Sequence, residues 1–580
     1  MDAPQGRCPV TGQTPPEGQQ EATDLDAVRQ LARVRRTAIT RRVSAVAAVV
    51  LAVVLLASAL SPPLTQRLEL LLEVLPFQAL HVAATTTIFA AAALAMTARG
   101  LWHGHRLAWM VALVTLFAAV VFNLIKGLDV EEGLISLALG GWLIYRRRDF
   151  AVMPGRAQVR LALIATGAAF VSSVVVATLL VLTLGRDQHP RPIETARAAA
   201  ERLGGRQQLP LVELNPVLTP LLTALGVAIV VAGLWLLLSP RWRVQPTAAE
   251  HHADRERARA ILATHGGGTL GYFALRDDKD WFFTGDSVVA YAVRGGVCLV
   301  SPDPIGPWGD RYQVWADFTD FVSMHGWAVA VVGASNDWLG VYRMAGLRPT
   351  YLGDEAVVDV AGFSLAGKSM KGLRQAVTRI ERAGVSANFL DPAAATAQQR
   401  EAVLRIAESS RRGEAERGFS MTLSRLFDPD DTGLLLVTAT NEQGRVLGFI
   451  QWIPAAHLPG WSLDVMRRDT DADIPNGVTD FLIVKTLEHI AAQGSRGLGL
   501  NFAVLRETMN AEPSTRVEVL TRKVLDVVAE HSQLESLGRF NEKYHPRWEA
   551  RYVARGDGSQ LVGQALAVAR AEGLIDLPGR

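Results

Sequence analysis

The pattern of apolar and polar positions changes near residue 244, where long apolar runs give way to short alternating ones. Six apolar runs precede this point, at residues 44–60, 80–96, 107–124, 134–145, 161–184 and 217–238. A helix needs about 20 apolar residues to cross a bilayer, so these runs predict six membrane-spanning helices. The fourth run is the shortest and is rich in glycine. We therefore assign residues 31–244 to a transmembrane domain.

Arginine placement predicts how these helices are oriented. The connections before the first run and after the second, fourth and sixth runs are basic, whereas the others are less basic or acidic. Basic connections stay in the cytoplasm, so both ends of the transmembrane domain are expected there; the long loop 185–215 has several arginines, but long loops follow this rule weakly. His81 lies in the second run and is expected at a helix end, near the membrane interface. The alternative is that it transfers protons or binds a lipid headgroup.

Two polar segments flank the transmembrane domain. Residues 1–30 are rich in Pro, Gly, Gln and acidic side chains, a composition typical of a disordered tail. They lack the charged-then-apolar order of a cleavable signal peptide. Residues 245–259 are polar and are expected to be a linker into the soluble part of the chain.

The remainder alternates between patterns of strands and of helices. Apolar runs between residues 270 and 307 predict short strands, followed by helices at 311–325 and 337–345 with a strand at 327–332 between them. This is a first α/β domain, residues 260–362.

A second α/β domain, residues 394–560, has the more informative pattern. Its predicted elements are two strands joined by the turn Asn441–Gly444, a third strand, a helix and a fourth strand. They lie at 433–440, 445–454, 460–468, 478–493 and 497–505. Strand, turn, strand, strand, helix, strand is the plan of an N-acetyltransferase-like (GNAT) sheet. Residues 561–580 are left as a C-terminal tail.

Residues 363–393 connect the two domains and contain the clearest helical pattern, at 364–383. At 100° per residue, four cations fall within one narrow sector: Lys368, Lys371, Arg379 and Arg382. The opposite side is apolar: Leu373, Ala376, Val377 and Ile380. The basic ridge is either a solvated face or a contact for tRNA phosphates or anionic headgroups, and the sequence leaves both open.

Composition narrows the chemistry. The net charge of +2 over 580 residues gives no overall nucleic-acid signature. The two cysteines, Cys8 and Cys298, are far apart and form neither a CxxC zinc site nor a disulfide framework. Cys298 lies in an apolar strand, where a buried small side chain is expected. We expect no metal and no cofactor.

Several spaced motifs resemble one family. They are SLDVMRRD (462–469), LNFAVLR (500–506), LESLGRFNEKYHPRWEARY (534–552), FFTGDSVVAY (282–291), SPDPIGP (301–307) and RGFSM (417–421). They resemble the lysylphosphatidylglycerol synthase family, the synthase half of the multiple peptide resistance factor. The resemblance covers roughly residues 258–553 and is closest to the branch fused to a lysyl-tRNA synthetase, although we expect no synthetase here. It implies tandem GNAT-like domains and transfer of an amino acid from aminoacyl-tRNA to a lipid.

The resemblance implies a substrate-binding Asp464 and Arg467 and a functional Lys543. The residue chemistry agrees, because an aminoacyl ester carries an α-ammonium that needs a carboxylate, and a tRNA 3′ end needs cations. Strand alternation would place Asp464 and Arg467 on opposite faces, so the strand must bend or end near Val465. The alternatives are an internal salt bridge between Asp464 and Arg467, and a surface role for Lys543.

Roles follow for the remaining candidates. Lys543 is a candidate to stabilise the oxyanion or to bind the lipid phosphate. Glu416 and Arg506 are candidates for contacts with the amino-acid side chain and the tRNA backbone. The sequence shows no Ser-His-Asp constellation, so we assign no covalent intermediate. The predicted reaction is ester exchange onto the hydroxyl of phosphatidylglycerol or a related lipid, with lysine as the amino acid implied by the resemblance; it would make the membrane surface less anionic.

Two other functions are alternatives to aminoacyl transfer. Acyl-CoA transfer needs a pyrophosphate cradle after the third strand, but that turn carries Asp469, Asp471 and Asp473, which would repel it. A lipid flippase or membrane scaffold with a degenerate synthase domain is the non-enzymatic alternative, and the intact DVMRR and EKYHPRW motifs argue against it. The sequence leaves open the amino acid, the acceptor lipid and any homo-oligomer formed through the membrane domain.

Overall fold

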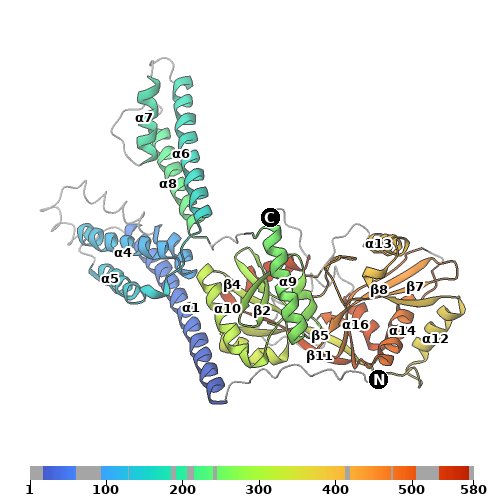
Figure 1. Ribbon diagram of the computed structural model, residues 1–580. Coiled ribbons are helices and arrows are strands. Elements are labelled where there is room, and N and C mark those ends of the chain that lie inside the picture. The colour runs from blue at the N-terminus through green and yellow to red at the C-terminus, as the bar shows by residue number, and fades with distance from the viewer. Residues whose placement is uncertain are drawn as a thin grey trace. The chain divides into compact units, whose positions relative to one another are not determined.

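The computed structural model describes residues 17–60, 93–127, 130–184, 191–204, 215–239, 245–411, 418–471, 474–504 and 534–573. The chain divides into two compact units. The helical unit comprises residues 33–244 with 321–327, and the α/β unit comprises 1–32, 245–320 and 328–580. Figure 1 shows the helices and strands of both units.

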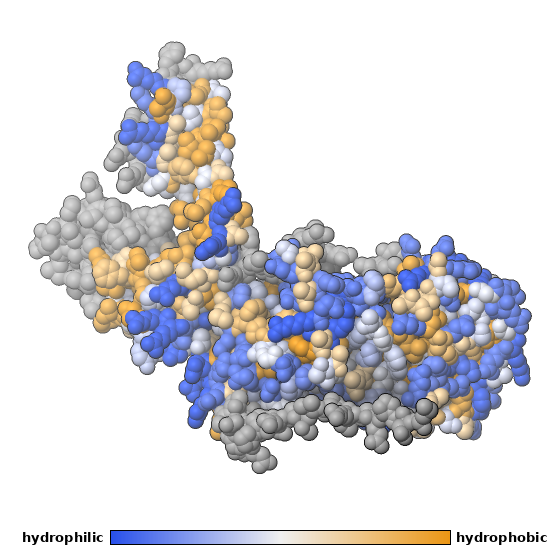
Figure 2. Space-filling model, in the orientation of Figure 1, coloured by the Kyte–Doolittle hydropathy of each residue, from blue (hydrophilic) through white to orange (hydrophobic). Residues whose placement is uncertain are grey.

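Long helices build the helical unit: α1 (Glu17–Leu60), α4 (Arg106–Gly127), α5 (Val130–Tyr145), α6 (Arg156–Leu184), α7 (Pro192–Leu203) and α8 (Asn215–Leu237). Helices α4 and α5 pack on each other, and α6, α7 and α8 form a separate group (Figure 1). Much of α6 and α8 exposes apolar side chains, as the hydrophobic surface of these helices in Figure 2 shows. Helices that are apolar on nearly all sides suit a lipid environment.

Three of the described helices are long and apolar enough to cross a membrane: Leu25–Ala57, Arg156–Thr183 and Pro220–Leu237. Shorter apolar helices cover Arg106–Val121 and Gly133–Tyr145. The helical, apolar character expected of this region is thus confirmed, whereas the count of six remains a prediction. Most of the expected second span, with His81, lies outside the described residues.

Three segments expected to be irregular are helical. Helix α1 begins at Glu17, inside the expected tail, because residues 19–30 lack glycine and proline and are rich in helix formers. Helix α7 lies in the expected long loop 185–215. Helix α9 (Ala248–His265) occupies most of the expected linker, and it begins at a capping box in which Thr247 and Glu250 bond each other's backbone N–H groups.

The α/β unit is built on one sheet of 11 strands in the order β1-β2-β3-β4-β11-β5-β10-β9-β8-β7-β6. The strands are β1 (Asp280–Thr284), β2 (Ser287–Arg294), β3 (Val297–Val300), β4 (Ala328–Ala334), β5 (Arg348–Asp359), β6 (Ser386–Leu390), β7 (Leu435–Thr440), β8 (Val446–Ala455), β9 (Gly460–Arg468), β10 (Gly497–Val504) and β11 (Arg547–Arg555). The β3–β4 and β9–β10 pairs are parallel, and the other pairs are antiparallel.

The last strand lies within the first half of this sheet, and the β5–β10 pair joins the two halves. Strand β11 pairs with both β4 and β5, so the C-terminal end of the chain completes the half that begins at residue 260. The segment 363–393 was expected to be a connecting helix, but its last part forms strand β6 at the far edge of the second half. Helix α17 (Leu561–Ala571) packs against β2, β3 and β4, although residues 561–580 were expected to be a tail.

The elements predicted for the second domain are confirmed. Strands β7, β8, β9 and β10 and helix α14 (Val478–Ala492) lie where the pattern placed them, and Gly444 has φ +79° in the turn between β7 and β8. Helices α12 (Lys371–Arg382), α14 and α16 (Leu534–Glu542) cover one face of this half, and α13 (Ala397–Arg411) covers the other (Figure 1). We call these the α14 face and the α13 face.

Candidate functional site

A β-bulge places Asp464 in its position on β9. The antiparallel register pairs Gln451 with Val465 and Trp452 with Leu463, which leaves Asp464 as the extra residue. An extra residue breaks the alternation of side chains along a strand. Leu463 accordingly belongs to the core on the α14 face, and Val465 belongs to the core on the α13 face. The irregularity that the sequence analysis required near Val465 is therefore present.

The Asp464 carboxylate is only 5% exposed and is held by donors from two segments. Its Oδ1 accepts hydrogen bonds from the hydroxyl of Thr422 at 3.0 Å and from the backbone N–H of Leu423 at 2.7 Å. Its Oδ2 accepts one from the side-chain amide of Gln451 at 2.7 Å. These three hydrogen bonds stabilise the ionised carboxylate and fix its orientation.

Residues 418–424 supply two of these donors, and Arg276 holds this segment in place. The Arg276 guanidinium is 8% exposed and donates to the backbone oxygens of Gly418, at 2.6 Å, and Thr422. It also donates to the Ser424 hydroxyl at 2.8 Å and to the Asp278 carboxylate at 2.9 Å. The segment includes positive φ angles at Gly418 and Ser424, so its path depends on such tertiary contacts.

A second buried cation lies beside the same segment. Lys279 is fully buried; it donates to the backbone oxygens of Phe273 at 2.9 Å and Ser301 at 2.6 Å, and its ammonium lies 4.5 Å from the ring centroid of Phe419. Burial, and then the nearby Arg276, lower the pKa of Lys279 to about 7. Burial also raises the pKa of Glu572, which accepts a hydrogen bond from Ser420 at 2.6 Å.

Arg467 lies three residues beyond Asp464 and is half-buried. It is paired in register with Phe449, which belongs to the core on the α13 face. Its Nη1 donates to the backbone oxygen of Met466 at 3.0 Å. Because the bulge shifts the alternation of side chains between the two faces of the sheet, Asp464 and Arg467 both lie toward the α13 face. Two residues can contact one substrate only if they lie on the same face.

Lys543 lies in a different environment. Its ammonium is 3.1 Å from both carboxylate oxygens of Asp480, in the first turn of α14, and its side chain is 44% exposed. Tyr544 donates to the same carboxylate at 2.7 Å. These contacts place Lys543 on the α14 face. The described contacts of Lys543 and Asp464 share no residue, and a role for Lys543 in transfer remains a prediction.

The helix predicted at residues 364–383 packs as expected, but it is shorter and covers only Lys371–Arg382. Leu373, Ala376, Val377 and Ile380 are its buried residues, as predicted. Lys371, Arg379 and Arg382 are exposed on α12, whereas Lys368 precedes the helix. Arg379 also donates to the backbone oxygen of Asn476 at 3.1 Å.

The structure describes only one of three further candidate residues. Glu416 and Arg506 lie outside the described residues. Cys298 is fully buried in β3 as predicted, and burial raises its pKa far above the usual range.

The turn after β9 has its own ion pairs. Arg445 bonds both Asp469, at 2.9 Å, and Asp471. Burial alone would raise the pKa of Asp469, but these hydrogen bonds hold it below its usual range. These carboxylates lie where acyl-CoA transfer would need a pyrophosphate cradle.

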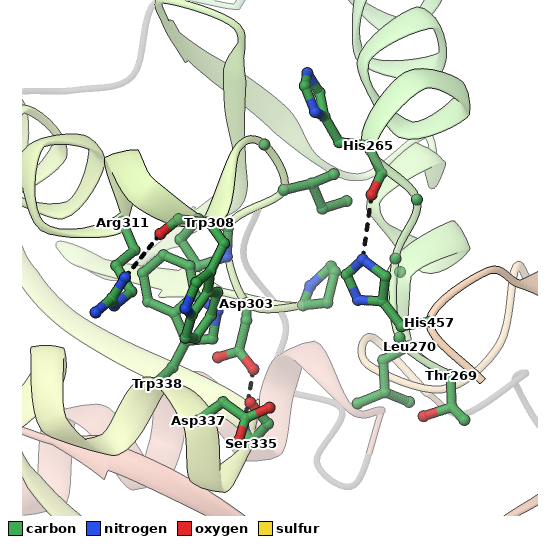
Figure 3. Close-up of a pocket in the computed structure, with 18 of the residues that line it drawn as sticks. His265, Thr269, Leu270, Asp303, Trp308, Arg311, Ser335, Asp337, Trp338 and His457 are labelled. Carbon is green, nitrogen blue, oxygen red and sulfur yellow. Dashed lines mark hydrogen bonds between the residues drawn. The ribbon is translucent and has the colours of Figure 1, made fainter. Parts of the chain in front are cut away.

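A pocket of about 510 Å³ opens on the α/β unit. Figure 3 shows Trp308 and Trp338 on one side, His457 on the opposite side and Asp303 between them. Asp303 accepts hydrogen bonds from the Tyr342 hydroxyl at 2.6 Å and the Ser335 N–H at 2.9 Å, while burial raises its pKa.

Buried polar groups connect this pocket with the α13 face of β9. Arg551 lines the pocket and donates to Glu355 at 2.6 Å and to Thr269 at 2.9 Å. A Cβ added to Gly499 would lie 3.0 Å from Ser462 Oγ and 3.4 Å from Glu355 Oε1. Ser462 is two residues before Asp464, and Gly499 lies between core residues of the α14 face, so both point away from that face. Ser462 and Glu355 thus both lie next to Gly499, and Glu355 is bonded to the pocket residue Arg551.

One group of side chains has the composition of a metal site. Ligand atoms of His252, Glu256 and Asp430 lie within 4.8 Å of one another at the surface. Asp430 also accepts a hydrogen bond from Arg255 at 3.4 Å, a cation that competes with any metal ion there.

Sequence reasoning did not identify Thr422, Gln451 or Arg276 as parts of the site. Thr422 directly follows the RGFSM motif, which was noted only for its resemblance. Gln451 is a polar residue in an otherwise apolar strand, and this was an available signal. Arg276 gave no local signal, because the carbonyls it binds lie 142 and 146 residues away.

Comparison with known proteins identifies the family. The family described as "Phosphatidylglycerol lysyltransferase, C-terminal" matches residues 259–555, just over half of the chain. The chain belongs to this family. The resemblance drawn from the sequence motifs is thereby confirmed, and the Asp464 bulge and the pocket both lie within the family region.

Two similar proteins and one solved structure are consistent with this family membership. The lysylphosphatidylglycerol biosynthesis bifunctional protein LysX of Rhodococcus jostii is 37% identical over 337 residues, which is 56% of this chain and 29% of that protein. Its namesake from Mycobacterium tuberculosis H37Rv is also 37% identical, over 28% of its length. The chain thus spans less than a third of these relatives. The structure of L-PGS from Bacillus licheniformis has a TM-score of 0.50 at 24% identity, covering 55% of this chain and 97% of that one, and supports the fold.

Proposed function

We propose that this protein is a membrane-bound aminoacyltransferase that moves an amino acid, lysine by analogy with its relatives, from aminoacyl-tRNA to a hydroxyl of phosphatidylglycerol. Membership of the phosphatidylglycerol lysyltransferase family and the names of the LysX relatives support this proposal. The observation that carries it is the Asp464 carboxylate, buried at a bulge and fixed by Thr422, Leu423 and Gln451. A fixed anion in a buried site is what the α-ammonium of an aminoacyl ester requires.

The reaction is an ester exchange. The lipid hydroxyl oxygen forms a bond to the aminoacyl carbonyl carbon, the bond to the tRNA ribose oxygen breaks, and the hydroxyl proton passes to the ribose oxygen. Similar bonds are formed and broken, so the charged tRNA supplies all the energy needed. Asp464 orients the ester through its ammonium, and orientation together with oxyanion stabilisation supplies the acceleration. Arg467, on the same face of β9, is placed to bind the tRNA 3′ end.

We place the acceptor headgroup in the pocket between Trp308, Trp338 and His457. The guanidinium groups of Arg547 and Arg551 pair with Glu549 and Glu355 and supply further N–H donors for a phosphodiester, and Asp303 and Ser335 supply polar groups for glycerol hydroxyls. Glu355 bonds the pocket residue Arg551, and Ser462 lies in β9 two residues before Asp464, so we propose that a lipid hydroxyl approaches the ester from this side.

The exposed cations of α12, with Lys368 before it, form a candidate surface for tRNA phosphates or anionic headgroups. Six spans with both ends of the helical unit in the cytoplasm would place the α/β unit with charged tRNA. Reporter fusions after Arg243 test this topology. Alkaline phosphatase activity there, which requires export, would contradict both the topology and the tRNA-dependent reaction.

The test of the function is lipid aminoacylation by the full chain with charged tRNA and phosphatidylglycerol vesicles, read by mass spectrometry. Asp464→Asn removes one charge from a charge-assisted hydrogen bond worth roughly 1.5–3 kcal/mol, so transfer should fall about ten- to a hundredfold. Asp469→Asn is the matched control, because Asp469 is also buried but bonds Arg445. In the same assay, Lys543→Gln should lower the rate if Lys543 stabilises the oxyanion.

Melting temperatures separate binding from a structural salt bridge. If Asp464 only paired with Arg467, Asp464→Asn would lower the melting temperature, and adding Arg467→Gln would restore it. Full activity in stably folded Asp464→Asn would remove Asp464 from the site. Lipid extracts unchanged by the wild-type chain would favour the flippase or scaffold alternative.

A further inference from the structure

The side chain of Gln451 is oriented by its neighbour Asp464. Gln451 lies in β8 at 1% exposure, and its Nε2 donates to Asp464 Oδ2 at 2.7 Å. A flipped amide would turn its oxygen toward the carboxylate and repel it, so the carboxylate fixes which amide atom faces which way. The Gln451 oxygen must therefore face another partner.

That partner is missing among the described residues. Gln451 Oε1 is a buried acceptor for which the described part of the chain supplies no donor. The adjacent β8 residues Ile450 and Trp452 are fully buried in the core. A buried acceptor without a donor destabilises a protein, and such groups in native structures commonly have a functional reason. Here the acceptor is carried by the same side chain that fixes the substrate-binding carboxylate.

We propose that the Gln451 carbonyl is a second acceptor for the α-ammonium of the aminoacyl group, beside Asp464. This inference rests on the proposed function. An ammonium has three N–H donors, so one can reach Asp464 and another can reach Gln451. An α-hydroxyl group has a single donor and no charge, so it satisfies at most one of the two. Gln451 therefore helps the site to prefer α-amino over α-hydroxy acyl groups.

The experiment compares two substrates that differ only at this group. The kcat/KM for lipid transfer is measured with aminoacyl-tRNA and with α-hydroxyacyl-tRNA bearing the same side chain, for the wild type and for Gln451→Leu. Thr422→Val is the matched control, because it also removes one donor to Asp464 but removes no acceptor for the ammonium. The preference for the amino substrate should fall about tenfold in Gln451→Leu and less than threefold in Thr422→Val.

Several outcomes would overturn the proposal. Equal losses of preference in Gln451→Leu and Thr422→Val would limit Gln451 to positioning Asp464. The melting temperature shows whether Gln451→Leu folds. If it does not, Gln451→Met, which keeps the length of the side chain, is used in the same comparison. A wild-type chain without transfer would overturn both the function and this inference. Loss of transfer in Asp464→Asn with unchanged preference in Gln451→Leu would overturn this inference alone.

Discussion

Replacing Arg276 with methionine should loosen residues 418–424 and weaken the Asp464 site without touching Asp464 itself. The guanidinium bonds the backbone oxygens of Gly418 and Thr422 in a buried position. Methionine retains much of the apolar stem and provides no donor for either oxygen. The segment would then lose the contacts that hold its donors, Thr422 and Leu423, against the carboxylate.

The expected magnitude follows from burial. A buried acceptor left unsatisfied costs about 1–3 kcal/mol, so two carbonyls cost about 2–6 kcal/mol. The Asp278 carboxylate also loses its partner, but its side chain is 30% exposed and water compensates for most of that loss. Each 1.4 kcal/mol changes an equilibrium constant tenfold. The lower value of about 2 kcal/mol therefore lowers the protection of the segment against hydrogen exchange about 30-fold.

Hydrogen exchange of the full chain in detergent measures this opening, read at peptides that contain the Leu423 amide. Arg374→Met is the matched control, because Arg374 also bonds two loop carbonyls, those of Leu365 and Gly367, but at an exposed site. Its effect on exchange near residues 365–367 should stay below about fivefold, since water replaces the lost donor. Lipid aminoacylation should fall in Arg276→Met. Unchanged protection at Leu423 in Arg276→Met would refute the claim that Arg276 holds this segment.

Two further predictions concern charge. Burial and Arg276 lower the pKa of Lys279 to about 7, against about 10.4 in an unfolded chain. Between pH 7 and 10 the unfolded state therefore binds more protons than the folded state, so the free energy of unfolding rises with pH. Lys279→Met should flatten that rise in melting temperatures measured from pH 7 to pH 9, and an unchanged slope would contradict the assignment. Changing Lys368, Lys371, Arg379 and Arg382 together to Gln should weaken binding to tRNA or anionic vesicles and flatten its salt dependence, with α12 still folded on its buried face. Equal binding across a salt series would instead identify a solvated face.

Local patterns were enough to place most elements of the second half. Alternation of period two and a helical period are written in consecutive residues, so β9 and α14 lie where the sequence put them. The buried side of α12 followed from the same reasoning. The helical state of the linker was also available locally, in the capping box of Thr247 and Glu250, and was missed.

The sequence by itself determined the family, the order of the elements β7, β8, β9, α14 and β10, and the need for an irregularity near Val465, because each rests on short motifs or on patterns in consecutive residues. Only the tertiary structure decided that this irregularity is a bulge at Asp464, that β11 inserts between β4 and β5, and that Lys543 pairs with Asp480. It also decided that Gln451 bonds Asp464 and that Arg276 bonds the segment beside Asp464. In these cases, strand pairings and hydrogen bonds join residues up to 223 positions apart, and no local pattern specifies which distant partner will satisfy a buried group.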